Sequence, residues 1–310
     1  MTVSSDPIRI DPSDPVLSRL LERCTFPAAG TAVVCGVSGG ADSTSLLALA
    51  VAAGLVVEAV HVDHGLRSDS AADGHHVARL ASAWGAAFRS VSVVVEPGPN
   101  LEERARLARH RALGPAALVG HTADDQAETV LIRLLRGTGP AGLAAMSPDR
   151  HPILGLRRTE TRTLCRHLGV TPIDDPSNAD DRFVRNRVRH EVLPLLDDVA
   201  GRDVVPLLAR LADRAAEQAD LIDDLASHID PTDARELAGV HGVVASRALR
   251  SWWISETGSD HPPDSAALER MLDVVRGASV GCDVTDGWSL RRTAGRLRLV
   301  PPADAPPRHG

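Results

Sequence analysis

The first half of the chain alternates short apolar runs with segments whose apolar residues recur at helical spacing. Short runs that are rich in β-branched residues and bounded by Gly, Pro or polar residues predict buried strands. These runs cover residues 31–37, 55–62, 88–95 and 116–120. Helical spacing follows each run and ends near residue 136. Strands that alternate with helices through short loops predict an α/β fold with a doubly wound parallel sheet.

The second half has a different pattern, which predicts a second, smaller domain. Residues 137–194 are rich in loop-forming positions, and an alanine- and acid-rich helix is expected from about residue 204 to 228. We place the domain boundary at residue 200, with domains of residues 1–200 and 201–310. The expected elements beyond that helix are helices near 240–255 and 265–276 and a hairpin of strands 288–292 and 296–300, joined at Ala294-Gly295.

Composition excludes several classes of protein. The chain is 43% hydrophobic and 24% charged, which is typical of a globular protein, and it has no run of about 18 apolar residues that could span a membrane. We therefore expect a cytoplasmic protein without a membrane partner. The net charge of −7 argues against polyanion binding by the whole surface, so any nucleic-acid contact must use a local arginine patch.

A phosphate-binding loop is predicted where the first strand leads into a helix. Residues 38–43 read Ser-Gly-Gly-Ala-Asp-Ser. The two glycines let the backbone approach an anion, and the hydroxyls, the free N–H groups and the helix dipole can point at phosphate. It is not a Walker A loop, because the chain contains no lysine. The pattern resembles the pyrophosphate-binding loop of the PP-loop ATP pyrophosphatases; an ordinary glycine-rich turn is the alternative.

Acidic residues near this loop are candidates for cation binding. Asp42 stands beside the loop, where a triphosphate would repel it unless a cation lay between them, so it is a candidate Mg²⁺ ligand. Asp125 and Glu128 are three residues apart and share a helical face after the fourth strand, where they suit a cationic substrate or a metal. For all three, the alternative is an acid that only complements the dipole of its helix.

A histidine and an arginine cluster complete the candidates. His61 ends the second strand close to His64, and a nucleotide contact is favoured over zinc because no cysteine ligand is nearby. A structural histidine is the alternative. Arg182, Arg185 and Arg189 share one face if their segment is helical, which predicts a phosphate-binding stripe. They could instead neutralise the aspartates just upstream.

Taken together, these segments resemble the tRNA(Ile)-lysidine synthetase family. The matching segments are SGGADS, HVDHGLR, GHTADDQAET followed by LLRGTG, and DDPSNADDRFVRNRVRHEVLP, all within residues 31–196. The DPSN and RNRVR elements separate this family from other PP-loop enzymes. Its members are bacterial ligases that join lysine to the wobble cytidine of an isoleucine tRNA with a CAU anticodon.

The resemblance implies that ATP binds at residues 38–43, that the cytidine C2 oxygen is adenylated, and that the lysine ε-amine then displaces AMP. Residues 1–200 would be the catalytic domain and residues 201–310 a tRNA-binding domain. By motif position, the implied roles are ATP binding by Ser38, Gly39, Gly40, Ala41, Asp42 and Ser43, Mg²⁺ binding by Asp42, lysine binding by Asp125 and Glu128, contact with phosphate or the lysine carboxylate by Arg187, and contact with the adenylate by His121.

Two features depart from the family pattern. His151-Pro152 stands where members often have Arg-Pro, and we expect a short form that lacks the extra C-terminal domain with which many members grip the acceptor stem. Two other functions stay open: a tRNA-thiolating PP-loop enzyme, although these commonly use C-x-x-C pairs that are missing here, and a non-catalytic ATP-sensing module. The sequence also leaves a homodimer open.

Overall fold

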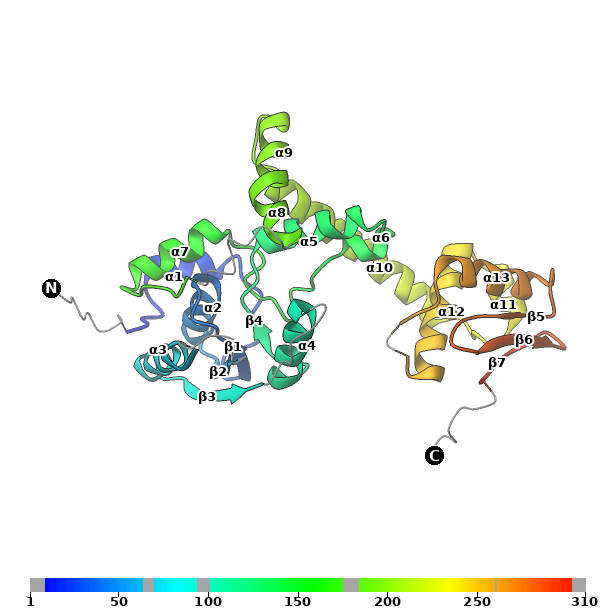
Figure 1. The fold of residues 1–310 in the computed structure, drawn as a ribbon, viewed down its shortest axis with the longest axis horizontal. Helices are drawn as coiled ribbons and strands as arrows, with labels where there is room; N and C mark the ends of the chain where they lie inside the picture. The colour runs from blue at the N-terminus through cyan, green and yellow to red at the C-terminus, as the bar shows by residue number, and fades with distance from the viewer. Residues whose placement is uncertain (1–8, 64–69, 94–100, 175–183, 260, 303–310) are drawn as a thin grey trace. The chain divides into compact units, whose positions relative to one another are not determined.

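The computed structural model of the chain has two compact units (Figure 1). It describes residues 9–63, 70–93, 101–174, 184–259 and 261–302. The units are Met1–Ala215 and Ala216–Gly310, so the division falls inside helix α10, Val205–Ser227. The sequence places the boundary slightly earlier, at residue 200, just before this helix.

A parallel sheet forms the centre of the first unit. Its strand order is β3-β2-β1-β4, and Cys35 of β1 is in register with Ala59 of β2 and Leu118 of β4. The strands are β1 (Ala32–Gly36), β2 (Val56–Asp63), β3 (Ala87–Ser92) and β4 (Leu118–Val119). This arrangement confirms the predicted α/β fold, with each strand close to its expected position.

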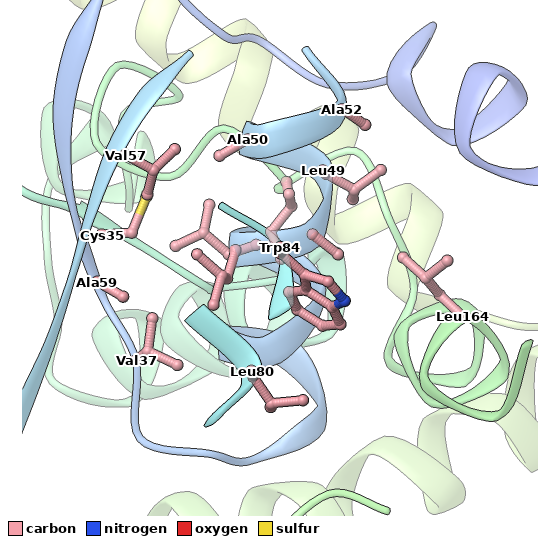
Figure 2. Close-up of a cluster of buried hydrophobic side chains, with 14 of the residues drawn as sticks. Cys35, Val37, Leu49, Ala50, Ala52, Val57, Ala59, Leu80, Trp84 and Leu164 are labelled. Carbon is pink, nitrogen blue, oxygen red and sulfur yellow. The ribbon is translucent and has the colours of Figure 1, made fainter. Parts of the chain in front are cut away.

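Helices cover both faces of the sheet. On one face, α2 (Ala41–Ala52) and α3 (Ser70–Ala83) pack on the strands, and Figure 2 shows Leu49 and Trp84 among the buried side chains there. On the other face, α4 (Leu101–Leu113) contributes Leu113 to a cluster with sheet valines. Because α2 lies between the sheet and helices α1 (Pro15–Leu21) and α7 (Arg158–His167), it is apolar almost all round.

The segment expected to be loop-rich has long connections, at residues 144–157 and 168–174, but it also contains helices that the pattern did not predict. Apart from α7, it holds α6 (Pro140–Leu143), α8 (Val184–Arg187), the π-helical turn η2 (Val188–Val192) and the beginning of α9 (Leu193–Ala200). The pattern hid α7 because its buried face is small and includes the hydroxyl of Thr161. The predicted helix 204–228 is confirmed as α10. Among the described helices, none is both long enough and apolar enough to cross a membrane.

The strand order creates a topological switch point between β1 and β4. The chain leaves β1 for β2 on one side and later returns to β4 on the other side. In open α/β sheets, ligands bind outside the carboxyl ends of the strands at such a point. The loop after β1 leads into α2, and the loop after β4 leads into α5, Ala123–Leu135. Both loops therefore belong to the expected ligand site.

The second unit combines helices with an antiparallel sheet. Trp253, Met271 and Leu290 are almost completely buried in its core. Ala294 and Gly295 have φ angles of 50° and 82°, as a two-residue hairpin turn requires, which confirms the predicted hairpin. Its elements beyond α10 are α11 (Ala234–Gly239), α12 (Gly242–Thr257), α13 (Ser265–Arg276), β5 (Gly281–Asp283), β6 (Ser289–Thr293) and β7 (Arg296–Val300).

Candidate active site

The loop after β1 is held in a tight shape by its own hydrogen bonds. The Ser43 hydroxyl accepts a bond from the Ser38 N–H (3.1 Å) and donates to the Gly40 carbonyl (3.0 Å). Gly39 has a φ of 89°, and its carbonyl accepts a bond from the Ile173 N–H (2.9 Å). A Cβ on Gly39 would collide with the Ile173 side chain. Position 39 therefore requires glycine for both conformation and space.

The start of α2 leaves donor groups for an anion. Gly40 is the N-cap residue and makes no side-chain cap. The first N–H groups of a helix have no partner inside it, and they lie at the positive end of the helix dipole. Together with the hydroxyls of Ser38 and Ser43, which lie 3.1 Å apart, they are the donors that the predicted phosphate cradle needs, and phosphate binding here stays a prediction.

Gly120, at the end of β4, lets the second loop approach this cradle. A Cβ there would lie 2.7 Å from the Asp42 carbonyl oxygen and 2.9 Å from the Ser43 Cα, which are backbone atoms that cannot move aside freely. We expect Gly120→Ala to reduce the free energy of unfolding by about 1–3 kcal/mol and to weaken ATP binding. Urea unfolding and calorimetric titration with ATP measure the two effects.

The matched control is Gly139→Ala, because a Cβ at Gly139 meets nothing within 4 Å and its φ is −77°. This variant should keep wild-type stability and ATP affinity. If the two glycine variants behave alike, the close approach of the β4 loop to α2 is not required for the cradle.

Asp42 lies in the first turn of α2 and is anchored to α7. The Thr161 hydroxyl donates a hydrogen bond to Oδ1, and the Arg158 Nε lies 3.7 Å from Oδ2. Burial, and next the charge of Asp125, raise the pKa of Asp42 to about 6. A cation bound beside this carboxylate would favour its ionised form.

Asp125 and Glu128 lie on α5 with their carboxylates side by side. Thr122 caps the helix, and its N–H and hydroxyl both donate to Asp125 Oδ2 at 2.9 Å. The Glu128 side chain is fully buried, and that of Asp125 is only 10% exposed. Neither can rely on water for neutralisation, so each needs polar partners from the protein or a ligand.

Arginines supply those partners. Arg158 Nη2 donates to Asp125 Oδ1 (2.8 Å) and to Glu128 Oε1 (3.2 Å). Arg189 donates to Glu128 through Nε (2.7 Å) and Nη2 (3.1 Å), and Arg185 Nε lies 3.4 Å from Glu128 Oε2. Burial alone would raise the pKa of Asp125, but the charges around it, Arg158 first, hold the pKa below its usual value.

Two of the three arginines in the predicted stripe form ion pairs with the acidic pair. Arg185 and Arg189 contact Glu128, whereas Arg182 lies outside the described residues. Arg187 is exposed and forms an ion pair with Glu191 (2.9 Å), four residues further along the same continuous helix. The roles in tRNA binding and catalysis given to these arginines stay predictions.

The candidate histidines are placed in two ways. His61 is buried, and its Nδ1 lies 3.0 Å from the Val37 carbonyl, so Nδ1 carries the proton and donates; His64 lies outside the described residues. His121 Nδ1 lies 2.9 Å from His151 Nδ1, so one ring donates and the other accepts. Burial lowers the pKa of His121 to about 3. His151 stands at the position that departs from the family pattern. Its ring contacts His121, the residue predicted to contact the adenylate.

Sequence reasoning missed two residues of this site, Arg158 and Thr161, which reach the acids described above from the first turn of α7. The neighbouring Arg157 lies outside the site and binds Asp124 through Nε (3.1 Å) and Nη2 (3.2 Å). An arginine pair that begins a helix was the available signal. Without the fold it does not indicate a partner, because the acids lie 30 or more residues away along the chain.

The comparisons with known proteins agree on one kind of protein. A family model described as a PP-loop domain matches residues 14–196. The tRNA(Ile)-lysidine synthase of Nocardia farcinica is 41% identical over 309 residues, covering 91% of this chain and 96% of that protein. The one from Rhodococcus jostii is 41% identical (86% and 89% covered), and the one from Pseudomonas syringae pv. tomato is 36% identical (86% and 67% covered).

A solved structure supports the fold. The U34-tRNA thiolase NcsA from Methanococcus maripaludis is 16% identical and superposes with a TM-score of 0.52, covering 65% of this chain and 78% of that one. At this identity the likeness concerns the fold alone. Together with the match to the PP-loop domain model, it confirms the predicted PP-loop type of α/β fold.

Proposed function

Because this chain belongs to the tRNA(Ile)-lysidine synthase family, we propose that it ligates L-lysine to C2 of the wobble cytidine of tRNA(Ile) with a CAU anticodon. The observation that carries the proposal is the meeting of a phosphate cradle and a buried carboxylate pair at one switch point. A sensor that only binds ATP has no use for such a pair. A thiolase is disfavoured because the relatives that match most of the chain are lysidine synthases.

The proposed reaction has two steps. The cytidine C2 oxygen attacks the α-phosphorus of ATP, and the bond to pyrophosphate breaks. The ε-amine of lysine then attacks C2, loses a proton, and AMP leaves with the oxygen. The cradle at residues 38–43 would bind the pyrophosphate portion through N–H groups and hydroxyls, which suits charge that develops on the leaving group.

Mg²⁺ fits this site as a companion of ATP. It usually binds through one or two carboxylates together with substrate phosphates, and Asp42 offers a carboxylate next to the cradle. Because burial disfavours the charge on Asp42, a divalent cation there would be well matched. When bound, the ion would neutralise phosphate charge, and Thr161 would orient the carboxylate through its hydroxyl.

Asp125 and Glu128 are proposed to hold the ε-ammonium of lysine between their carboxylates. Arg187 is proposed to contact phosphate or the lysine carboxylate, and His61 and His121 are proposed to lie against the nucleotide. Arg182, Arg185 and Arg189 are proposed to contact the tRNA backbone. Arg185 and Arg189 also pair with Glu128, which neutralises part of their positive charge. A cytoplasmic location and residues 201–310 as a tRNA-binding domain also belong to this proposal.

The direct test is incorporation of labelled lysine into RNA. With ATP and Mg²⁺ present, we expect label in tRNA(Ile) with a CAU anticodon and one AMP released for each lysine. Methionine tRNA shares the anticodon, so it is the control, and it should remain unlabelled because contacts outside the anticodon must discriminate. Equal labelling of both tRNAs would contradict the proposed specificity. Label from a sulfur donor would favour thiolation.

A further inference from the structure

One nitrogen of Arg158 occupies the place that the proposed function gives to an ammonium group. Its Nη2 donates both to Asp125 Oδ1 (2.8 Å) and to Glu128 Oε1 (3.2 Å). A positively charged nitrogen between two carboxylate oxygens is the arrangement that a bound alkylammonium would adopt. The carboxylate pair therefore already holds a cation of its own, and a substrate amine has to replace it.

The acids would keep other partners if Arg158 left. Glu128 retains both contacts with Arg189, and Asp125 Oδ2 retains the two hydrogen bonds from Thr122. Two oxygens would lose the hydrogen bonds from Arg158. Asp125 Oδ1 would then have Arg189 Nη2 at 3.6 Å, and Glu128 Oε1 could accept a hydrogen bond from a new donor. Losing one cation from a buried carboxylate pair is costly, so Arg158 leaves at low cost only if another anion receives its guanidinium and an amine then takes its place.

The backbone of Arg158 is anchored by a contact that does not involve its guanidinium. Its N–H donates to Asp124 Oδ2 (2.8 Å), which holds the residue at the start of α7. The side chain is 18% exposed, and its Nε lies 3.7 Å from Asp42 Oδ2, on the helix that begins at the phosphate cradle. A guanidinium binds phosphate oxygens through paired hydrogen bonds, so a polyphosphate on the cradle offers Arg158 an alternative partner within a short reach.

We propose that Arg158 fills the ammonium position while no amine is bound, and that a polyphosphate on residues 38–43 draws it away so that the substrate ε-ammonium can enter. This inference rests on the proposed function, because the amine is taken to be lysine. Arg158 is then a specificity-determining residue that links the two substrates. ATP strengthens lysine binding, and by reciprocity lysine strengthens ATP binding.

Calorimetric titration of the full chain with L-lysine tests this link. The titration is run with and without the α,β-methylene analogue of ATP, which cannot release pyrophosphate, in the presence of Mg²⁺. For the wild-type chain we expect the analogue to tighten lysine binding by about fivefold or more. For Arg158→Gln, lysine should bind at least as tightly without the analogue as it does to the wild-type chain, and the ratio of the two affinities should fall to near one.

Arg157→Gln is the matched control. It removes the neighbouring guanidinium, which contacts Asp124 and Asp203 rather than the acidic pair, so the wild-type ratio of affinities should persist. Melting temperatures show whether each variant is folded. If Arg158→Gln does not fold, Arg158→Lys retains a cation but has a single nitrogen at its end, and its ratio should still fall below that of the wild-type chain.

Three results would overturn the inference. The first is a wild-type lysine affinity that the analogue does not change. The second is an Arg158 variant whose lysine affinity rises with the analogue as much as that of the wild-type chain. The third is an Arg158→Gln variant that binds lysine more weakly by the same factor with and without the analogue. The last would show that Arg158 only holds the carboxylates in place. Coupled binding of lysine without any transfer to tRNA would contradict the proposed function instead, and would leave this inference standing.

Discussion

Replacing Asp42 by asparagine should reduce AMP release by about 100-fold or more while leaving the chain folded. The loss follows from the proposed role, because a cation that stabilises phosphate charge contributes several kcal/mol and each 1.36 kcal/mol is a factor of about ten in rate. Stability should not fall. The pKa of Asp42, about 6, lies above its usual value, so its ionised form destabilises the folded chain above that pH, and asparagine removes this cost.

AMP release with tRNA(Ile), lysine and ATP, measured beside a thermal melt, checks both parts of this prediction. Asp124→Asn is the neighbouring control, because Asp124 pairs with Arg157 at the start of α7. It should retain far more activity than the Asp42 variant. Nearly normal AMP release by Asp42→Asn, at an unchanged melting temperature, would mean that Asp42 only complements the dipole of its helix.

The second large effect is expected at the carboxylate pair. Asp125→Asn and Glu128→Gln should each raise the KM for lysine by about tenfold or more, because a hydrogen bond to a charged group contributes about 1.5–3 kcal/mol. The KM for ATP should change less, since neither residue belongs to the loop at residues 38–43. Initial rates at varied lysine and at varied ATP separate the two constants.

Stability must be measured alongside these constants. Glu128→Gln removes a fully buried charge that pairs with Arg158 and Arg189, and breaking a buried pair costs about 3–5 kcal/mol. Asp125→Asn is the milder variant, because an amide oxygen can still accept the bonds from Thr122. A larger rise in the KM for ATP than in the KM for lysine would reassign these acids to metal binding.

The sequence predicted the sheet and the turn after β1 well because both depend on local patterns, whereas phosphate binding by that turn stays a prediction. Short apolar runs predicted each strand of the parallel sheet among the described residues. The glycine-rich turn predicted a backbone conformation that suits glycine, and Gly39 has a φ of 89°. The hairpin turn at Ala294-Gly295 is equally local. The parallel arrangement also places the loops after β1 and β4 at one end of the sheet.

The arginines around the acids could not be predicted in the same way. Asp125 and Glu128 were chosen for their charge and spacing, but their partners come from two later segments whose patterns show only arginines near other charges. The pattern indicates no partner for Arg158 and predicts an RNA contact for Arg189, because an arginine in a sequence does not reveal whether it is exposed or pairs with a buried acid. Only the packing of α7 on α2, and of η2 on α5, brings them together.

The contact between Thr161 and Asp42 also bears on the order in which parts of the chain can fold. The two residues are 119 positions apart, and the Ser45 hydroxyl bonds to the Thr161 carbonyl over 116 positions. Such distant contacts form late in folding, because a long loop must close first. A chain emerging from the ribosome can therefore fold its early strands and helices while Asp42 still lacks its partners. Nascent chains that end before α7 would carry the cradle without the groups that orient it.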